Sequence, residues 1–316
     1  MSHDLNIALG AMEFGTRIDE STSFALLDQY VDGGGVWIDT ADCYAFWLSD
    51  SGAGGDSEAL IGRWLAQRPG LRDRVRIATK AGCEPVTPGV FPGPTTGLSK
   101  AALDRQLEAS LRRLGLDRVD LFFAHRDDRE VRAEEVAETL GAHAAAGRIG
   151  RVGLSNWPVW RAERARQHAE AQGLPAADTL QLRYSYLQPR PMVRDHSHDH
   201  RMGWITDETL DYLEANPRWE AWAYSPLMQG SYDRDDRAPE EAFDHLGSDR
   251  RKAAVAGVAD ELGVTRGSVV LAWMTGGSPA IRPIVATSRP AQLAEALEAA
   301  RLTLTPDQRQ VLDGAW

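Results

Sequence analysis

Short apolar runs rich in β-branched residues alternate along the chain with longer stretches in which apolar residues recur every three or four positions. The short runs predict buried strands, and the longer stretches predict amphipathic helices, as Leu103, Leu107 and Leu111 illustrate. The predicted strands are Ile7–Leu9, Val36–Asp39, Val75–Thr79, Val119–Phe123, Ile149–Leu154, Thr179–Leu182, Glu220–Ala223 and Arg282–Val285. The predicted helices are roughly Ser21–Asp32, Ser57–Ala66, Lys100–Leu114, Ala133–Ala146, Val159–Ala171, Asp207–Ala215, Arg250–Leu262 and Ala291–Ala299.

This alternation predicts an α/β fold, a closed (β/α)8 TIM barrel with its helices outside. A doubly wound open sheet is the alternative, but no GxGxxG turn opens any of the helices. No flexible linker divides the chain, so residues 1–316 are expected to form one domain. Four long loops would follow strands and lie at the C-terminal face of the barrel, where active sites sit. They are Ala45–Asp56, Ala81–Leu98, Tyr186–Trp204 and Gln229–Ser248.

Composition narrows the class of protein further. With 43% hydrophobic residues among 316, the chain can bury one sizeable core, and no apolar stretch is long enough to cross a bilayer. The N-terminus lacks the basic and apolar regions of a secretory signal, so we expect a cytoplasmic protein whose two cysteines, Cys43 and Cys83, are reduced. The net charge of -11 repels nucleic acid and anionic membranes, and neither is an expected partner.

Ionisable side chains follow three consecutive predicted strands. Asp39 ends the second strand, Tyr44 comes five residues later, Lys80 ends the third and His125 follows the fourth. Neighbouring strands of a parallel barrel end at the same mouth, so these four groups can converge. Singly, each has a plainer interpretation as a turn cap, a loop aromatic, a solvated charge or a hydrogen-bonded histidine. Together they favour chemistry, because a buried aspartate–lysine pair is costly unless it is used.

The four groups suit proton transfer to a carbonyl oxygen. A phenol has a pKa of about 10, and a nearby cation such as Lys80 favours its ionised form, which would make Tyr44 a better acid. Asp39 would keep the lysine charged, and His125 would hydrogen-bond the substrate oxygen or the tyrosine and help to place the carbonyl. The remaining strand ends offer partners for a nicotinamide: amide and hydroxyl groups at Ser155, Asn156 and Gln181, and an aromatic face at Tyr224.

With these residues in view, the chain resembles the aldo-keto reductase superfamily over nearly its whole length. The catalytic tetrad of that family matches Asp39 and Tyr44 in IDTADCY, Lys80 in IATKAG and His125 in LFFAHRDD. The resemblance implies reduction of an aldehyde or ketone to an alcohol, with Tyr44 as general acid and hydride from the nicotinamide C4. A small-molecule carbonyl is then the expected partner. No metal is required for this reaction. The sequence gives no indication of the oligomeric state.

Three further segments resemble the cofactor-binding elements of the family: GLSNW, AYSPL and IVATSRPAQLAEA. The residues they imply, with Gln181, are Ser155, Asn156, Tyr224, Ser225, Leu227, Ser288, Arg289, Gln292 and Glu295. The chain departs from the family where Ile284-Val285-Ala286 stands for IPG and Glu295-Ala296 for E-N, and the loop after Gly230 lacks a lysine. Arg289, with Arg234 as a possible helper, is the cation for a 2′-phosphate, so NADPH is expected, with NADH as the alternative.

Two other functions remain open from sequence. One is a non-catalytic nicotinamide-nucleotide-sensing subunit, and the other is a barrel aldolase in which Lys80 forms a Schiff base. Aromatic residues on the mouth loops are candidates for the substrate pocket: Trp47, Phe91, Trp157 and Tyr186. The alternating histidines His196, His198 and His200 are more typical of a solvated loop than of a metal site.

Overall fold

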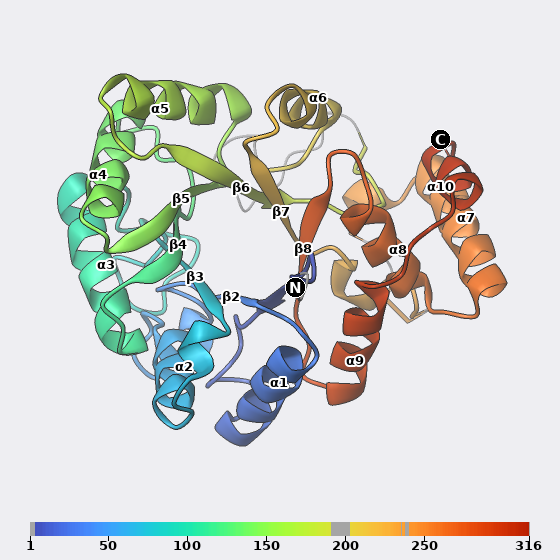
Figure 1. Ribbon diagram of the computed structural model, residues 1–316, viewed down its shortest axis with the longest axis horizontal. Coiled ribbons are helices and arrows are strands. Elements are labelled where there is room, and N and C mark those ends of the chain that lie inside the picture. The colour runs from blue at the N-terminus through green and yellow to red at the C-terminus, as the bar shows by residue number, and fades with distance from the viewer. Residues whose placement is uncertain (1–3, 191–202, 235, 238–239, 316) are drawn as a thin grey trace.

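Eight parallel strands form the centre of the molecule. The computed structural model describes residues 4–190, 203–234, 236–237 and 240–315, so His196, His198 and His200 lie outside the described residues. The strands close into a barrel in sequence order, with the eighth paired to the first (Figure 1). They are β1 (Ala8–Gly10), β2 (Trp37–Asp39), β3 (Arg76–Ala81), β4 (Val119–Ala124), β5 (Ile149–Ser155), β6 (Ala177–Arg183), β7 (Glu220–Tyr224) and β8 (Ile281–Val285). The predicted (β/α)8 barrel is confirmed.

Helices surround this barrel, and all those predicted from the periodicity are present. They are α1 (Glu20–Asp32), α2 (Asp56–Ala66), α3 (Lys100–Leu114), α4 (Ala133–Ala145), α5 (Val159–Ala171), α6 (Asp207–Ala215), α7 (Leu246–Leu262) and α9 (Pro290–Ala299). Two more helices, α8 (Arg266–Thr275) and α10 (Pro306–Asp313), were not predicted. Within the described residues, no helix combines the length and apolar character that a bilayer crossing requires.

The helix that covers the barrel between β7 and β8 is α8. It packs on β8 and α9, whereas α7 packs on the outer side of α8 and carries α10 (Figure 1). Because α8 lies between the barrel strand β8 and the outer helix α7, all the residues from Gly267 to Ala272 are buried. Its apolar residues are therefore consecutive and do not recur every three or four positions, so the sequence lacks the period that identifies an amphipathic helix.

Large side chains fill the inside of the barrel. The rings of Trp37 and Trp222 meet edge to face with centroids 5.2 Å apart, and the ring of Phe123 approaches Trp222 at 5.9 Å. Ala8, Ala78 and other small or aliphatic residues complete this cluster. The barrel is consequently a packed core, and access to it is from its mouth.

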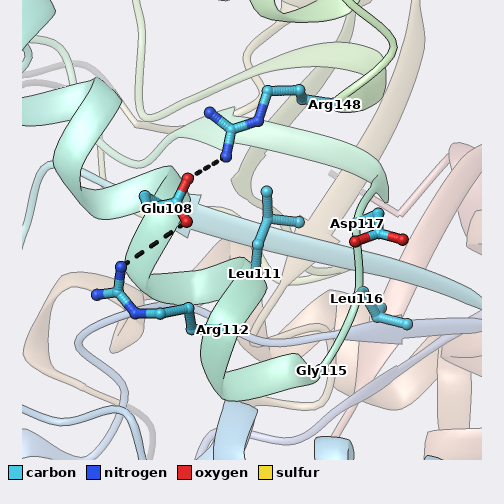
Figure 2. Close-up of a pocket in the computed structure, with 7 residues that line it drawn as sticks. All are labelled: Glu108, Leu111, Arg112, Gly115, Leu116, Asp117 and Arg148. Carbon is cyan, nitrogen blue, oxygen red and sulfur yellow. Dashed lines mark hydrogen bonds and ion pairs between the residues drawn. The ribbon is translucent and has the colours of Figure 1, made fainter.

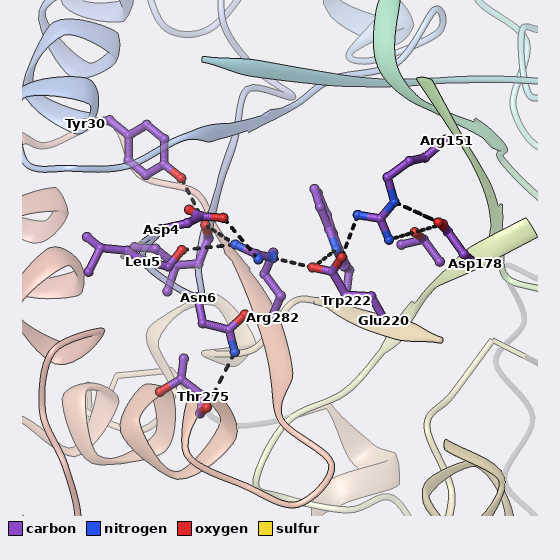
Figure 3. Close-up of polar contacts among 12 residues, drawn as sticks. Asp4, Leu5, Asn6, Tyr30, Arg151, Asp178, Glu220, Trp222, Thr275 and Arg282 are labelled. Carbon is purple, nitrogen blue, oxygen red and sulfur yellow. Dashed lines mark hydrogen bonds and ion pairs between the residues drawn. The ribbon is translucent and has the colours of Figure 1, made fainter. Parts of the chain in front are cut away.

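An ion-pair network, drawn in Figure 3, joins residues in the first positions of β5, β6, β7 and β8, the strand ends opposite those that carry the mouth. Glu220, the first residue of β7, binds Arg151 of β5 and Arg282 of β8, each at 2.7 Å. Arg151 also binds Asp178 at 2.9 Å, and Trp222 donates to Glu220 at 3.0 Å. One carboxylate thus ties three strands and a core tryptophan together at the floor of the barrel.

Glu220→Gln is therefore expected to destabilise the fold by about 2 kcal/mol at neutral pH, the size of a lost hydrogen bond to a charged group. Burial raises the pKa of Glu220, but the charges of Arg282 and Arg151 outweigh it and hold the pKa below the ordinary 4.5. The contribution is full above pH 4.5 and is lost as pH falls below it. Thermal denaturation of both proteins at several pH values checks this, and a difference that does not shrink in acid would contradict it.

Candidate active site

Three neighbouring strands deliver the predicted catalytic residues to one mouth. Asp39 is the last residue of β2, Lys80 lies one residue before the end of β3, and His125 directly follows β4. Main-chain hydrogen bonds continue past the strand ends, from the Asp42 N–H to the Lys80 carbonyl and from the His125 N–H to the Ala81 carbonyl. The first bond holds the loop that carries Tyr44 against β3, and the second holds the segment after β4 against it.

The ammonium of Lys80 is the centre of the arrangement. It is fully buried and donates to Asp39 Oδ2 at 2.7 Å, to the Thr40 carbonyl at 2.8 Å and to Tyr44 Oη at 2.6 Å. The Tyr44 hydroxyl in turn donates to Asp39 Oδ2 at 3.1 Å. A protonated lysine has three N–H donors, and each has an acceptor here. The network is therefore complete when Lys80 carries its charge.

The electrostatics differ in one respect from the sequence-based expectation. Burial raises the pKa of Tyr44 well above the ordinary 10, and the Asp39 carboxylate adds to this effect. Burial also lowers the pKa of Lys80, while Asp39 opposes that change. The sequence led us to expect a lowered pKa for Tyr44, but the net direction is upward, because burial and the Asp39 carboxylate set it. Tyr44 consequently holds its proton at neutral pH, as a proton donor must.

His125 packs against the ring of Tyr44. The two rings meet edge to face with centroids 5.7 Å apart, and His125 is partly exposed. Its Nδ1 lies 3.7 Å from the sulfur of Cys43, and its backbone carbonyl accepts from Asn156 at 3.1 Å. The structure thus brings together all four residues predicted for the tetrad.

The residues predicted to hold a carboxamide lie beside the tetrad. Gln181, in β6, donates to Asp39 Oδ1 at 2.9 Å, and Ser155 ends β5. Asn156 has a left-handed backbone (φ 57°) that directs its side chain back to the mouth, where its Oδ1 accepts from the Tyr224 hydroxyl at 2.8 Å. Amide groups and an aromatic hydroxyl therefore lie within one network next to Asp39 and Lys80.

The residues predicted for the adenosine end lie further along the same face, around the N-terminus of α9. Ser288, Arg289, Gln292 and Glu295 are all exposed there. Gln292 accepts from the Thr287 hydroxyl at 2.7 Å, and Glu295 accepts from the Thr265 hydroxyl. Ser225, with a left-handed backbone (φ 55°), and Leu227 lie in the turn after β7. Arg234 is paired with Asp236, which leaves Arg289 as the better candidate for a phosphate.

The four aromatic residues proposed for the substrate pocket divide into two pairs. Trp47 and Phe91 are exposed, and both rings pack edge-on against Phe46. Trp157 and Tyr186 are buried in the core, and the Tyr186 hydroxyl donates to the Leu312 carbonyl at 2.6 Å. Only the first pair lies where a substrate can touch it without rearrangement.

Asp42 is a mouth residue that was not predicted from the sequence. It is buried, and within the part of the chain that the structure describes neither carboxylate oxygen has a hydrogen-bond partner. Burial raises the pKa of Asp42 to about 8; Glu58 adds to the shift and Arg113 opposes it. The available signal was a second aspartate three positions after Asp39, in a stretch otherwise short of charge.

A surface hollow lies away from this mouth, where α3 ends and β4 begins (Figure 2). Its lining is Glu108, Leu111, Arg112, Gly115, Leu116, Asp117 and Arg148. Glu108 is ion-paired with both Arg112 and Arg148 across it. None of the tetrad residues lines this hollow, so it is separate from the candidate active site.

Comparison with known proteins agrees with the geometry. Residues 6–316 match the aldo/keto reductase family. The chain belongs to this family. It is an oxidoreductase of the aldo/keto reductase class, which its tetrad and barrel had indicated.

Among its relatives is an uncharacterized oxidoreductase of Bacillus subtilis (strain 168), YrpG, 28% identical over 97% of this chain and 90% of that protein. A 6-dehydroglucose reductase of Novosphingobium aromaticivorans is 29% identical over 88% of this chain and 80% of its own length. The norsolorinic acid reductase stcV of Emericella nidulans is 28% identical over 88% and 70%.

Solved aldo-keto reductases share the fold. One from Klebsiella pneumoniae, in complex with NADPH, is 23% identical, with a TM-score of 0.71 over 98% of this chain and 90% of that one. The thermostable enzyme Tm1743, in complex with the inhibitor epalrestat, is also 23% identical, with a TM-score of 0.73 over 98% and 95%. At this identity the likeness concerns the barrel architecture.

Proposed function

We propose that this aldo/keto reductase reduces an aldehyde or ketone to an alcohol with NADPH, and that Tyr44 donates the proton. The observation that carries the proposal is the contact of 2.6 Å between Lys80 Nζ and Tyr44 Oη, inside a network closed by Asp39. A protonated phenol beside a buried cation at a barrel mouth is suited to protonating an oxygen as charge develops on it.

The residues at the mouth fit a dinucleotide. Amide groups of Asn156 and Gln181 lie beside the tetrad, and Arg289 stands at the N-terminus of α9, where anions are stabilised. When bound there, the nicotinamide supplies hydride from its C4. Binding of NADPH by the Klebsiella enzyme supports the choice of cofactor. The predicted cytoplasmic location and single domain stay predictions.

The chain's own residues have distinct parts in this mechanism. His125 places the substrate oxygen close to Tyr44, whose ring it meets at 5.7 Å. Tyr44 transfers its proton to that oxygen as the carbonyl carbon accepts hydride, which leaves an alcohol and a phenolate. Lys80 stabilises the phenolate, because its ammonium already contacts Oη. Asp39 keeps the ammonium in place through its bond of 2.7 Å.

Arg289→Ala is expected to weaken NADPH binding by roughly 10- to 100-fold, the value of a lost charge-assisted hydrogen bond to the 2′-phosphate, and to leave NADH binding nearly unchanged. Arg234→Ala is the matched control, because Arg234 is already paired with Asp236. Fluorescence titration of each variant with both dinucleotides measures the effect. Equal losses of affinity for NADPH and NADH would show that Arg289 does not bind the 2′-phosphate.

A panel of carbonyl compounds with NADPH oxidation as the readout tests the activity itself. The panel includes an aromatic ketone and a sugar ketone, because Trp47 and Phe91 offer rings at the mouth and the relatives include norsolorinic acid and 6-dehydroglucose reductases. Tight NADPH binding without turnover of any compound would favour the nucleotide-sensing alternative. The aldolase alternative has less support, because all three positions around Lys80 Nζ are taken.

A further inference from the structure

A second group of ionisable side chains adjoins the tetrad and shares His125 with it. Asp42, Cys43 and His125 each offer one ligand atom, and these atoms lie within 4.8 Å of one another. The sulfur of Cys43 and the Nδ1 of His125 are 3.7 Å apart. Carboxylate oxygen, thiolate sulfur and imidazole nitrogen are the ligands that Zn²⁺ binds in proteins.

The carboxylate of Asp42 is the second observation that points to a ligand. The residue is only 4% exposed, and within the described residues neither oxygen has a partner at normal hydrogen-bond geometry; only the adjacent Cys43 thiol is close enough to lower its pKa by hydrogen bonding. A buried carboxylate without a partner is unfavourable and calls for an explanation, such as an ion. The acidic residues Glu58 and Glu84 act on Asp42, and the nearby bases are already paired, Arg113 with Glu58 at 2.6 Å and Lys80 with Asp39 at 2.7 Å.

We propose that Asp42, Cys43 and His125 form a binding site for Zn²⁺ or a similar borderline-soft divalent cation. Tetrahedral zinc with Zn–S bonds of about 2.3 Å and Zn–N bonds of about 2.0 Å places sulfur and nitrogen about 3.5 Å apart. The 3.7 Å between Cys43 and His125 needs little adjustment to reach this value. Cys43 releases its thiol proton and Asp42 its carboxyl proton to solvent on binding, and water takes the fourth position.

The site shares His125 with the proposed reaction, and this part of the inference rests on the proposed function. A cation on Nδ1 fixes the imidazole toward Cys43 and Asp42, so the ring loses the freedom to follow the substrate oxygen. Binding of Zn²⁺ at this site therefore inhibits carbonyl reduction.

Cobalt titration of the metal-free enzyme tests the site without depending on activity. Tetrahedral Co²⁺ bound to a thiolate gives intense visible d–d bands and a near-ultraviolet charge-transfer band. We expect both in the wild type, a loss of the charge-transfer band in Cys43→Ser, and at least tenfold weaker binding in Asp42→Asn. Cys83→Ser is the matched control and should keep the bands. Circular dichroism and melting curves verify that each variant is folded.

Absence of the bands in the wild type, or survival of the charge-transfer band in folded Cys43→Ser, would overturn the site. Loss of the charge-transfer band in Cys83→Ser would show that Cys83 supplies the thiolate, and this result would also overturn the proposed site. For inhibition, Zn²⁺ should slow NADPH oxidation reversibly, with EDTA restoring the rate, and should act at least tenfold more weakly on Asp42→Asn. An active wild type that keeps its rate at saturating Zn²⁺ would refute the inhibition. If the wild type shows the bands but has no reductase activity, the metal site stands and only the proposed function is refuted.

Discussion

Tyr44→Phe is expected to lower kcat for carbonyl reduction by at least about a hundredfold, because the variant lacks the general acid. The change removes one oxygen and keeps the ring that packs against His125. Lys80 keeps its bonds to Asp39 and to the Thr40 carbonyl, so the buried cation stays partnered. Cofactor affinity should remain close to that of the wild type, and steady-state kinetics with a fluorescence titration measure both quantities.

Tyr212→Phe is the matched control for this prediction. It removes another partly buried phenolic hydroxyl, one that donates to Glu163 on the outside of the barrel, and should leave kcat unchanged. If Tyr44→Phe retained more than about a tenth of the wild-type kcat, the loss would be too small for a missing acid. A different group would then have to protonate the substrate.

Lys80→Met is expected to abolish activity to a similar extent and to cost stability as well. The side chain is fully buried, and its removal leaves the Asp39 carboxylate without its counter-charge. Breaking a buried ion pair on one side typically costs about 3–5 kcal/mol. Activity should fall because the phenolate formed at Tyr44 no longer faces a cation. Denaturant unfolding and kinetics at a temperature where the variant is folded separate the two effects.

The double variant Asp39→Asn/Lys80→Met distinguishes a catalytic lysine from a merely structural one. Neutralising Asp39 removes the unpaired charge, so most of the lost stability should return. Activity should stay absent, since the cation beside Tyr44 is still missing. Recovery of activity together with stability would show that Lys80 supports the fold and has no part in the chemistry.

Much of the site could be predicted from the sequence because it follows from strand ends. Parallel strands in sequence order bring the residues after each strand to one rim, so Asp39, Lys80 and His125 had to be neighbours once the barrel was predicted. Their order along the chain and the spacing to Tyr44 were sufficient for the resemblance. The side-chain contacts at the rim then agree with the roles expected for Asn156 and Gln181.

Other features depend on packing that the sequence pattern does not display. Helix α8 is buried on nearly all sides and so has no polar face to mark its period. Tyr186 follows a strand like the other mouth residues, but its ring turns inward against Trp273 on α8. The raised pKa of Tyr44 depends on burial, which a linear pattern does not report. Asp42 looked like one polar residue in a loop until its surroundings were known.

The last helix is fastened to the segment after β6. The Tyr186 hydroxyl donates to the Leu312 carbonyl, and Trp273, which packs against Tyr186, donates to Asp313 at 2.7 Å. A deletion that begins at Pro306 would strip away both of these anchors. Removal of the C-terminal helix should therefore destabilise the segment after β6, although the two are far apart in sequence. A fusion partner is better attached after Asp313, through a spacer.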